Sequence, residues 1–269
     1  MLCRPIFYSR FLSHSYSLGD IKIRLSLSGL YYLYVQKSSV MKVSINQPAY
    51  LPWPGYFDRI NKADLHIVLD HVQFEKNSFV NRNKVLQKNT PILLTVPIKT
   101  KGSFGNLAIN NLEIDNSKNW RRKHHQTIYA CYKKTEYFAI YKDFVDNLFS
   151  SSHSTFSDIL SFSQDNLLEY LGITTPIVYS STLDVSSTKS NLILDLCKMF
   201  NTTEYLSGPY GINYLDEDSF TANGISVSYH HYMQQSYPQG TGNFIPNLSI
   251  LDMIFNCGPN SFQYLPSLD

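Results

Sequence analysis

Residues 45–56 read Ile45-Asn46-Gln47-Pro48-Ala49-Tyr50-Leu51-Pro52-Trp53-Pro54-Gly55-Tyr56, with three prolines, one glycine and three large aromatic residues in this short span. Each proline fixes φ and lacks an amide donor. The backbone from Pro48 to Pro54 therefore cannot be helix interior or central strand. The pattern predicts a rigid, preshaped loop over residues 46–54, which we term the aromatic-proline loop.

The aromatic-proline loop has two interpretations. The rings of Tyr50, Trp53 and Tyr56 expose a large apolar area unless they pack on the core or enclose a ligand. Asn46 and Gln47 stand at the carboxyl end of a predicted strand, where ligands bind in open α/β sheets. We expect either an aromatic plug over the core or a substrate site lined by these residues.

The flanking residues predict a strand-helix-strand unit. Met41–Ile45 reads as a buried strand, Gly55–Ala63 as a short helix and Leu65–Leu69 as a second strand. A right-handed crossover brings the carboxyl ends of two parallel strands to the same edge of a sheet. Asp70 and Gln73, just past the second strand, should then lie beside the aromatic-proline loop.

The polar residues after the second strand suit recognition of a sugar phosphate. Asp70 and Gln73 can fix sugar hydroxyls or an amine, and Asp70 can accept a proton. Arg82, next to Asn81, is suited to bidentate capture of phosphate or carboxylate. The alternative for Arg82 is a structural ion pair with Asp70 or Glu75.

Two further strands, Ile92–Ile98 and Leu107–Ile114, are predicted to pair through a turn that contains Lys99 and Lys101. The lysines and glycines of this turn suit a phosphate-contacting hairpin, although it has neither a Walker nor a GxGxxG pattern. The alternative is a surface turn.

Asn119–Thr135 predicts a basic helix that carries His124. This histidine lies four residues from both Trp120 and Ile128, so the three share one helix face. An inward-facing histidine can act as a general base or a phosphate ligand, and its alternative is a structural residue in the core.

The second half of the chain repeats the strand-helix-strand order. Its predicted elements are the helix Ser157–Leu171 with Ser157 as N-cap, the strand Ile173–Tyr179, the helix Ser187–Phe200, the strands Glu204–Leu206 and Gly224–Tyr232, and the helix Ser249–Cys257. Ser207 and Gly208 follow a strand end, while Tyr237 and Gln239 belong to a second loop of aromatic residues and prolines. We assign all four to substrate binding. The order predicts an α/β fold with a mixed, largely parallel sheet, flanking helices and a more helical C-terminal half.

Composition bounds the function classes. The 269 residues suffice for a substantial core, and no apolar run approaches the length of a membrane span. The four cysteines form no CxxC pair, the adjacent His230 and His231 point to opposite sides of a strand, and we assign no metal. Residues 41–142 carry 16 basic and 7 acidic side chains, whereas residues 143–269 carry 2 and 13. This asymmetry favours an anionic partner at the first half, or else forms a solvated surface dipole.

Residues 1–40 are rich in serine, contain five Lys or Arg against one acidic residue, and show no sustained periodicity. Their composition imitates an organelle transit peptide. Because Met41 immediately precedes the first convincing strand, we interpret it as the initiator. We expect residues 1–40 to be a disordered leader or upstream translation, and residues 41–269 to be the domain.

Residues 41–269 resemble the WbqC-like proteins, which occur among bacterial O-antigen and capsule biosynthesis genes. The resemblance rests on Gln47-Pro48-x-Tyr50-x-Pro52-Trp53-x-Gly55-Tyr56-Phe57, Leu69-Asp70-x-Val72-Gln73-Phe74, Asn81-Arg82, Thr95-Val96-Pro97, Trp120, His124, Tyr205-Leu206-Ser207-Gly208, Tyr214-Leu215, Phe220 and Leu248-Ser249-Ile250-Leu251-Asp252. The family typically has histidine where this chain has Asn46, and an asparagine can orient a substrate but cannot take its proton.

The resemblance implies a cytoplasmic transferase that attaches an aminoacyl or acyl group, such as glycyl, to a nucleotide-linked amino sugar. ATP or an activated donor would supply the group, and nucleic acid is not expected except as an aminoacyl-tRNA donor. Asp70 and His124 are the catalytic candidates. The alternatives are a non-catalytic binder of glycan or sugar nucleotide, and a nucleotidyltransferase-like ligase by fold analogy alone.

We predict that residues 1–40 are dispensable for folding, because the first periodic strand begins at Met41. A chain that starts at Met41 should keep the melting temperature of the full chain in a thermal unfolding experiment. A loss of several degrees, or insolubility, would show that the leader packs on the domain.

Overall fold

The computed structural model describes residues 16–18, 21–24, 32–35, 40–100, 107–150, 153–240 and 242–267. Its centre is a five-stranded sheet in the order β10-β9-β4-β5-β8, in which every neighbouring pair is parallel. The strands are β4 (Lys42–Asn46), β5 (Leu65–Val68), β8 (Ile177–Tyr179), β9 (Glu204–Ser207) and β10 (Ser226–Tyr229). The predicted α/β class with a largely parallel sheet is confirmed.

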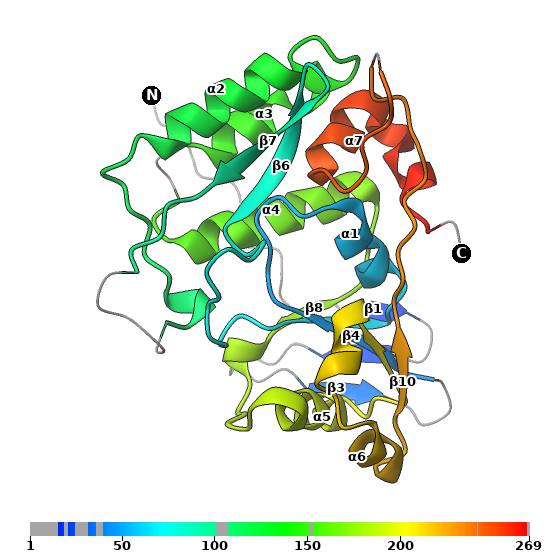
Figure 1. Cartoon of the computed structure of the whole chain (residues 1–269). Helices are drawn as coiled ribbons and strands as arrows, with labels where there is room; N and C mark the ends of the chain where they lie inside the picture. Colours follow the sequence, from blue (N-terminus) through cyan, green and yellow to red (C-terminus); the bar gives the residue numbers. More distant parts are fainter. Residues whose placement is uncertain are drawn as a thin grey trace, which may run out of the picture.

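Helices lie on both sides of the central sheet (Figure 1), and the side chains of the strands pack into two separate clusters with them. On one face Val43, Ile45 and Tyr205 pack with α5 (Lys189–Met199) and α6 (Glu217–Ala222). On the opposite face the strands meet α1, α4 and the larger of the two apolar clusters. This alternation follows from the period of two along a strand, and it fixes which side chains reach each helix layer.

The strand order reverses at β4. The chain runs from β4 through β5 to β8 on one side, then returns to place β9 and β10 on the other. The gap between the carboxyl ends of β4 and β9 is thus the topological switch point of the sheet. Ligands of open α/β sheets bind outside the strand ends at such a point.

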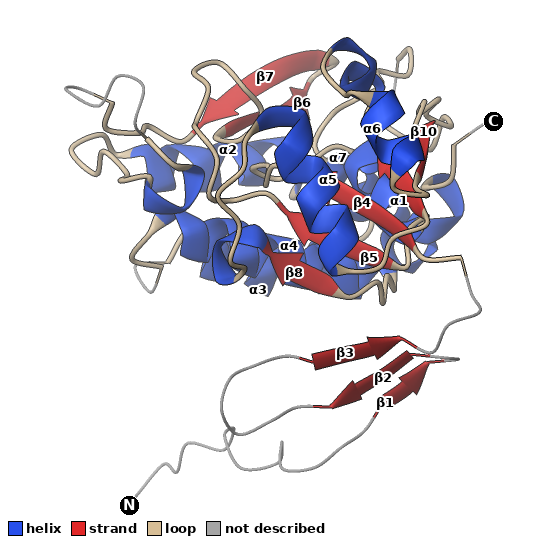
Figure 2. Ribbon diagram, turned by 90° about the horizontal axis from the view of Figure 1, so that it is seen from below, coloured by secondary structure: helices blue, strands red, loops and turns tan. Residues whose placement is uncertain are grey.

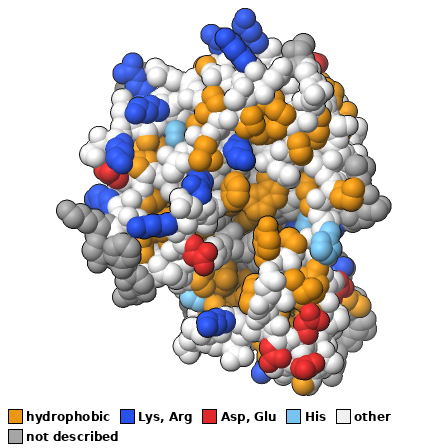
Figure 3. All heavy atoms as spheres, viewed as in Figure 1, with side chains coloured by type: hydrophobic (Ala, Val, Ile, Leu, Met, Phe, Trp, Pro, Cys, Tyr) orange, Lys and Arg blue, Asp and Glu red, His pale blue; other side chains and the backbone are white. Residues whose placement is uncertain are grey.

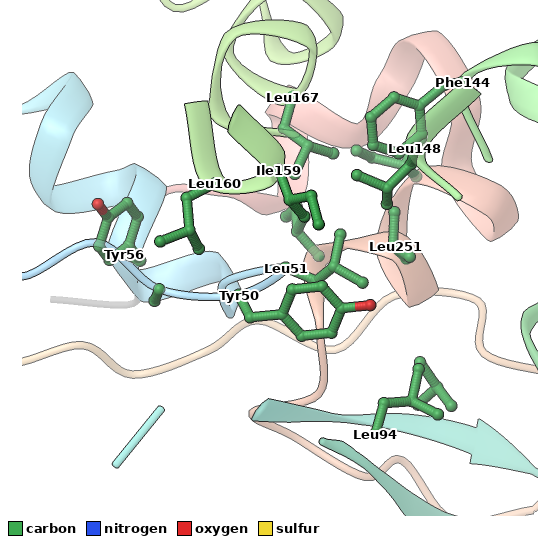
Figure 4. Packing of buried hydrophobic residues seen from close by; sticks show 14 of the residues in the cluster. Tyr50, Leu51, Tyr56, Leu94, Phe144, Leu148, Ile159, Leu160, Leu167 and Leu251 are labelled. Carbon is green, nitrogen blue, oxygen red and sulfur yellow. The ribbon is translucent and has the colours of Figure 1, made fainter. Parts of the chain in front are cut away.

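A mostly helical part covers the α1 face of the sheet. It consists of α1 (Pro54–Asn61), α2 (Trp120–Tyr132), α3 (Phe138–Leu148), α4 (Phe156–Leu171), α7 (Ile250–Cys257) and the antiparallel hairpin of β6 (Arg82–Gln87) and β7 (Thr90–Thr95). Tyr50 and Leu51 of the aromatic-proline loop are fully buried among residues of α3, α4, α7 and β7 (Figure 4). The loop therefore joins the sheet to the helical part.

The predicted pairing of residues 92–98 with residues 107–114 is limited to one antiparallel bridge, between Ile98 and Ile114. Strand β7 pairs instead with β6, a strand that the sequence analysis did not predict. Ile109–Asn111 form a 3-10 turn, and only single bridges at Ala108 and Ile114 remain on either side. The apolar residues of this segment, Ile109, Leu112 and Ile114, are buried by an irregular path that only resembles strand alternation.

Helix α4 begins one residue before the predicted N-cap Ser157. Thr155 is the N-cap, and its hydroxyl accepts a hydrogen bond from the amide of Asp158 while the Asp158 carboxylate accepts one from the amide of Thr155. This reciprocal capping box satisfies two amides that the helix leaves free. The helix ends at Gly172, which adopts a left-handed φ of 67°.

Within residues 1–40 the structure describes three short strands, β1 (Tyr16–Leu18), β2 (Ile21–Arg24) and β3 (Tyr32–Val35). They form their own antiparallel sheet and make no ladder with the central sheet (Figure 2). Whether this segment is dispensable stays a prediction. Among the helices described, none combines the length and apolar character that a membrane crossing requires.

Loss of the Thr155 cap should destabilise the protein measurably. We expect Thr155→Ala to lower the free energy of unfolding by about 1 kcal/mol, because one helix amide loses its acceptor. Ser157→Ala is the matched control and should cost less, since the Ser157 hydroxyl donates only to the Asn110 carbonyl at 3.2 Å. Urea denaturation measures both, and a larger cost for Ser157→Ala would contradict the cap assignment.

Candidate functional site at the carboxyl edge of the sheet

Polar residues stand at or just after the carboxyl end of every strand of the central sheet. In sheet order they are His230 after β10, Ser207 and Gly208 at β9, Asn46 at β4, Asp70 after β5 and Ser180 after β8. Parallel pairing aligns these ends along one edge. The predicted convergence of residues 46–53 and 70–73 at one edge follows from the parallel register of β4 and β5.

Asp70 is the most extensively bonded carboxylate of this edge. Its Oδ1 accepts from the Ser180 hydroxyl at 3.0 Å and from the Ser181 amide at 2.8 Å, and its Oδ2 accepts from the Ser181 hydroxyl at 2.6 Å. Asp70 also lines a pocket of about 370 Å³. The pocket's other walls include Pro48, Asn110, Ser157, Tyr179 and Ser181. A carboxylate held this firmly on a pocket wall can accept a proton or a hydrogen bond from a ligand.

Asn46 and Gln47 are both partly buried next to this pocket's Pro48. The Asn46 carbonyl accepts from the Leu69 amide at 2.6 Å, whereas its buried side-chain Nδ2 has no hydrogen-bond partner in the part of the chain that the structure describes. A buried donor without an acceptor is uncommon in native structures, and a ligand is one explanation for it.

The aromatic residues of residues 50–56 are mostly core. Tyr50 is fully buried, and Tyr56, also buried, donates its hydroxyl to Gln164 Oε1 at 3.1 Å. Trp53 is only partly buried, with its ring centroid 5.9 Å from that of Tyr56 and 5.7 Å from that of Phe79. This burial favours the core-plug interpretation for Tyr50 and Tyr56, and it leaves Trp53 as the accessible ring.

His124 lies in an aromatic enclosure on α2, where Nδ1 is 2.9 Å from the Tyr50 hydroxyl. The rings of Trp120 and Phe149 stand edge-on to the imidazole at centroid distances of 5.3 and 6.1 Å. Burial lowers the pKa of His124 to about 4, against a smaller opposite effect of a hydrogen bond to the Thr95 backbone. These contacts favour the structural alternative for His124.

Asn81 and Arg82 belong to a different place, the start of β6. The Asn81 amide donates to the Val96 carbonyl at 2.8 Å and so ties β6 to the end of β7. Arg82 donates to the side chain and the carbonyl of Asn77 rather than to Asp70 or Glu75. Both residues line a separate pocket of about 260 Å³. The role of Arg82 in anion binding stays a prediction.

Gln73 and Lys99 are the chain neighbours of Phe74 and Thr100, which line this second pocket. The Gln73 side chain is exposed, and its Oε1 accepts from the Leu107 amide at 2.9 Å. The ion pair of Lys99 with Glu113, 3.0 Å between Nζ and Oε2, is largely exposed. Lys101 lies outside the described residues.

Tyr237 and Gln239 form a buried network with Asp252 of α7. Both the Tyr237 hydroxyl and the Gln239 Nε2 donate to Asp252 Oδ2 at 2.8 Å. Gln239 also accepts from the Ile245 amide at 2.7 Å, so its side chain is fully engaged. These bonds favour a structural role, in which Tyr237 and Gln239 hold their loop against α7. Substrate binding by the two residues stays a prediction.

Arg59 of α1 is a buried residue at this edge that no local sequence pattern indicated. Arg59 is only 6% exposed, and its Nη1 occupies the space in which a side chain at Gly208 would begin. The signal was available in part, because a small-residue turn at a strand end indicates close approach of another group. The helical position of Arg59 gave no sign of its burial.

The face of the molecule in Figure 3 is hollowed at its centre, with hydrophobic side chains inside the hollow. On this face Lys and Arg gather mainly on the upper half and Asp and Glu on the lower. The charge asymmetry along the chain thus reappears in space. Within the described part of the chain, no three His, Cys, Asp or Glu side chains are grouped as metal ligands.

Comparisons with known proteins agree on one family. Residues 47–264 match the profile of the WbqC-like protein family. The uncharacterized protein Rv1507c of Mycobacterium tuberculosis (strain ATCC 25618 / H37Rv) is 33% identical over 226 residues, which cover 83% of this chain and 97% of that protein. No solved structure matches the chain.

The buried, neutral state of His124 predicts a pH dependence of stability. Its folded-state pKa of about 4 lies below the unfolded value of about 6.5, so the unfolded chain binds the proton first. The stability that His124 contributes is present above pH 6.5 and is lost as pH falls toward 4. At pH 5 the loss is about 2 kcal/mol.

We expect His124→Asn, which keeps a polar group near the Tyr50 hydroxyl, to lose less stability than the wild type between pH 7 and pH 5. Urea unfolding at the two pH values measures the difference. His66, whose pKa burial lowers to about 3, is unchanged in both proteins and contributes equally. An identical pH dependence would contradict the structural assignment of His124.

Proposed function

The chain belongs to the WbqC-like protein family, and from this premise we propose that it transfers an acyl or aminoacyl group to a nucleotide-linked amino sugar. The reaction would serve the synthesis of bacterial surface polysaccharide, in the cytoplasm, where nucleotide-linked sugars are available. The observation that carries the proposal is the Asp70 pocket at the carboxyl edge of the sheet. This edge is where α/β proteins bind ligands.

The pocket supplies groups that suit an amino sugar. Asp70 presents a carboxylate that three donors of the Ser180–Ser181 segment hold in place. The Asn110 and Ser157 side chains add neutral polar groups, and Tyr179 and Pro48 add apolar surface. Sugars bind to such mixed walls through hydroxyl contacts and through packing of their apolar faces.

In the proposed reaction the sugar amine attacks the carbonyl carbon of an activated acyl or aminoacyl donor. A C–N bond forms, the bond from the carbonyl to the donor's leaving group breaks, and the nitrogen gives up one proton. Asp70 Oδ2 accepts that proton from the neutral amine as the C–N bond forms, so that the nitrogen ends as a neutral amide, and the leaving group departs with the bonding electron pair. The Ser181 hydroxyl, 2.6 Å from Oδ2, then shares a hydrogen bond with the carboxyl group.

A second candidate function is a non-catalytic binder of a sugar nucleotide in the same pathway. The aromatic enclosure of His124 favours it, because that histidine has no described contact with the Asp70 pocket. The other titratable side chains of the pocket are Asp158, whose carboxylate is engaged in the α4 capping box, and Tyr179, whose pKa burial raises, so general base chemistry rests on Asp70. The two candidates differ in turnover, not in binding.

Incubation of the protein with nucleotide-linked amino sugars, ATP and amino acids or activated acyl donors tests the proposal. Mass spectrometry should find the sugar nucleotide enlarged by one acyl or aminoacyl group. Binding of the sugar nucleotide without any new product would instead support the non-catalytic candidate.

Asp70→Asn should leave sugar-nucleotide binding near wild type and lower turnover by about 10²-fold or more, because the amide cannot accept the proton. The matched control is Asp184→Asn, an exposed carboxylate that lines a different pocket and should retain full turnover. Titration calorimetry and product mass separate binding from catalysis. Full turnover by Asp70→Asn would remove the catalytic assignment.

A further inference from the structure

Arg59 is a buried cation without an acidic partner among the described residues. Its side chain is 6% exposed, and no hydrogen bond or ion pair joins its guanidinium to any carboxylate there. The adjacent Asp58 is already engaged, with Oδ2 2.7 Å from His230 Nε2 and 3.4 Å from Lys62 Nζ. An unpaired charge in the interior is costly, so Arg59 requires a counter-charge from outside the described residues, and a bound anion can supply it.

The groups that surround Arg59 do not supply this counter-charge. Burial lowers the pKa of Arg59, while the nearby tyrosines Tyr205, Tyr56 and Tyr214 act in the opposite direction only if they ionise. Burial raises the pKa of all three phenols, so they stay neutral at physiological pH. No group among the described residues therefore compensates the positive charge.

Arg59 points at the topological switch point of the sheet. Its Nη1 lies against Gly208, and a Cβ at that position would overlap the guanidinium nitrogen. Gly208 has a φ of −72°, which any residue can adopt, so what the glycine provides is space rather than backbone freedom. The chain thus leaves room for the guanidinium at the end of β9.

Asn46 stands opposite Gly208 at the same point. The parallel register pairs Ser44 with Leu206, and its continuation brings Asn46 level with Gly208. Asn46 lies on the same face of β4 as Ser44. The Ser44 hydroxyl is hydrogen-bonded to His66, whose ring is edge-on to that of Tyr56 on α1. The buried Nδ2 of Asn46, which has no hydrogen-bond partner among the described residues, is thus a donor on the same side of the sheet as α1.

We propose that Arg59, Asn46 and Gly208 form a subsite for the diphosphate of a nucleotide-linked sugar. The inference rests on the proposed function for the sugar and extends it to the anionic part of the ligand. A guanidinium and an amide N–H are both donors to phosphoryl oxygens, and the missing side chain of Gly208 is what lets the guanidinium lie at this strand end. Asp70 is the next polar group along the same edge, which places the sugar beside the phosphates.

This subsite replaces Arg82 as the principal anion contact. The Arg82 guanidinium already donates to Asn77 and lies in the pocket at the β6–β7 hairpin. It is also partly exposed, so its charge is solvated without a ligand. Arg59 has no such hydrogen bond among the described residues and is only 6% exposed. It also lies at the sheet edge rather than on the hairpin.

The test measures binding of uridine diphosphate and of inorganic pyrophosphate by titration calorimetry, with no sugar and no acyl donor present. Arg59→Met should weaken both ligands by about 10- to 100-fold, as expected for loss of a charged hydrogen-bond donor. Its ligand-free melting temperature should be equal to or higher than that of the wild type. Arg122→Met, which removes an exposed guanidinium of α2, is the matched control and should bind like the wild type.

Two further variants keep the test decisive if Arg59→Met does not fold. Gly208→Ala keeps the charge but displaces the guanidinium, and it should weaken both ligands to a similar degree. Asn46→Asp supplies the missing carboxylate, so it should raise the ligand-free melting temperature and suppress anion binding. If Arg59 had only a structural role, Asn46→Asp would not raise the melting temperature while it lowers the affinity for anions.

Absence of binding to wild-type protein would overturn the subsite, as would normal affinity in Gly208→Ala and Asn46→Asp. Equal loss of affinity in Arg82→Met would overturn the preference for Arg59. Because the assay contains no amino sugar, it fails or succeeds independently of group transfer. Diphosphate binding without product formation would retain the subsite and reject the proposed transferase.

Discussion

The parallel pairing of β4 with two neighbours, β5 and β9, is the constraint on which the rest of the structure depends. Because β4 pairs on both sides, its carboxyl end becomes the point from which the strand order diverges. The aromatic-proline loop leaves from this end and buries Tyr50 and Leu51 in the helical part. Sheet, helical part and switch point are thus fixed relative to one another by a single five-residue strand and the loop that follows it.

Several polar side chains are buried in the layer between the sheet and α1. Ser44 bonds His66, and Asp58 bonds His230, all four side chains being almost completely buried. Arg59 lies in the same layer without an acidic partner among the described residues. Buried polar groups stabilise a fold only when each has a hydrogen-bond or charge partner. Stability alone therefore does not explain a buried Arg59 in this layer. We infer that an anionic ligand supplies the missing charge partner of Arg59 when it binds.

The elements with a clear period were predictable from the sequence, whereas those set by tertiary packing were not. Val43, Ile45, Leu65 and Ile67 form apolar runs bounded by proline or polar residues, and they became the central strands. Strand β6 escaped prediction because RNKVLQ has few apolar residues, and the buried Asn83 bonds the Leu51 carbonyl, a contact that no local pattern reveals. The polar edge was predictable from strand ends, but the burial of Arg59 depends on Gly208, distant in sequence.

Hydrogen–deuterium exchange of the wild-type protein, with and without a nucleotide-linked amino sugar, tests most directly whether the ligand binds at the switch point. We expect slower exchange of backbone amides within residues 46–59 and 207–214, which border the carboxyl ends of β4 and β9. Protection confined to residues 77–100, around the pocket of Arg82, would contradict the assignment of the site to the sheet edge.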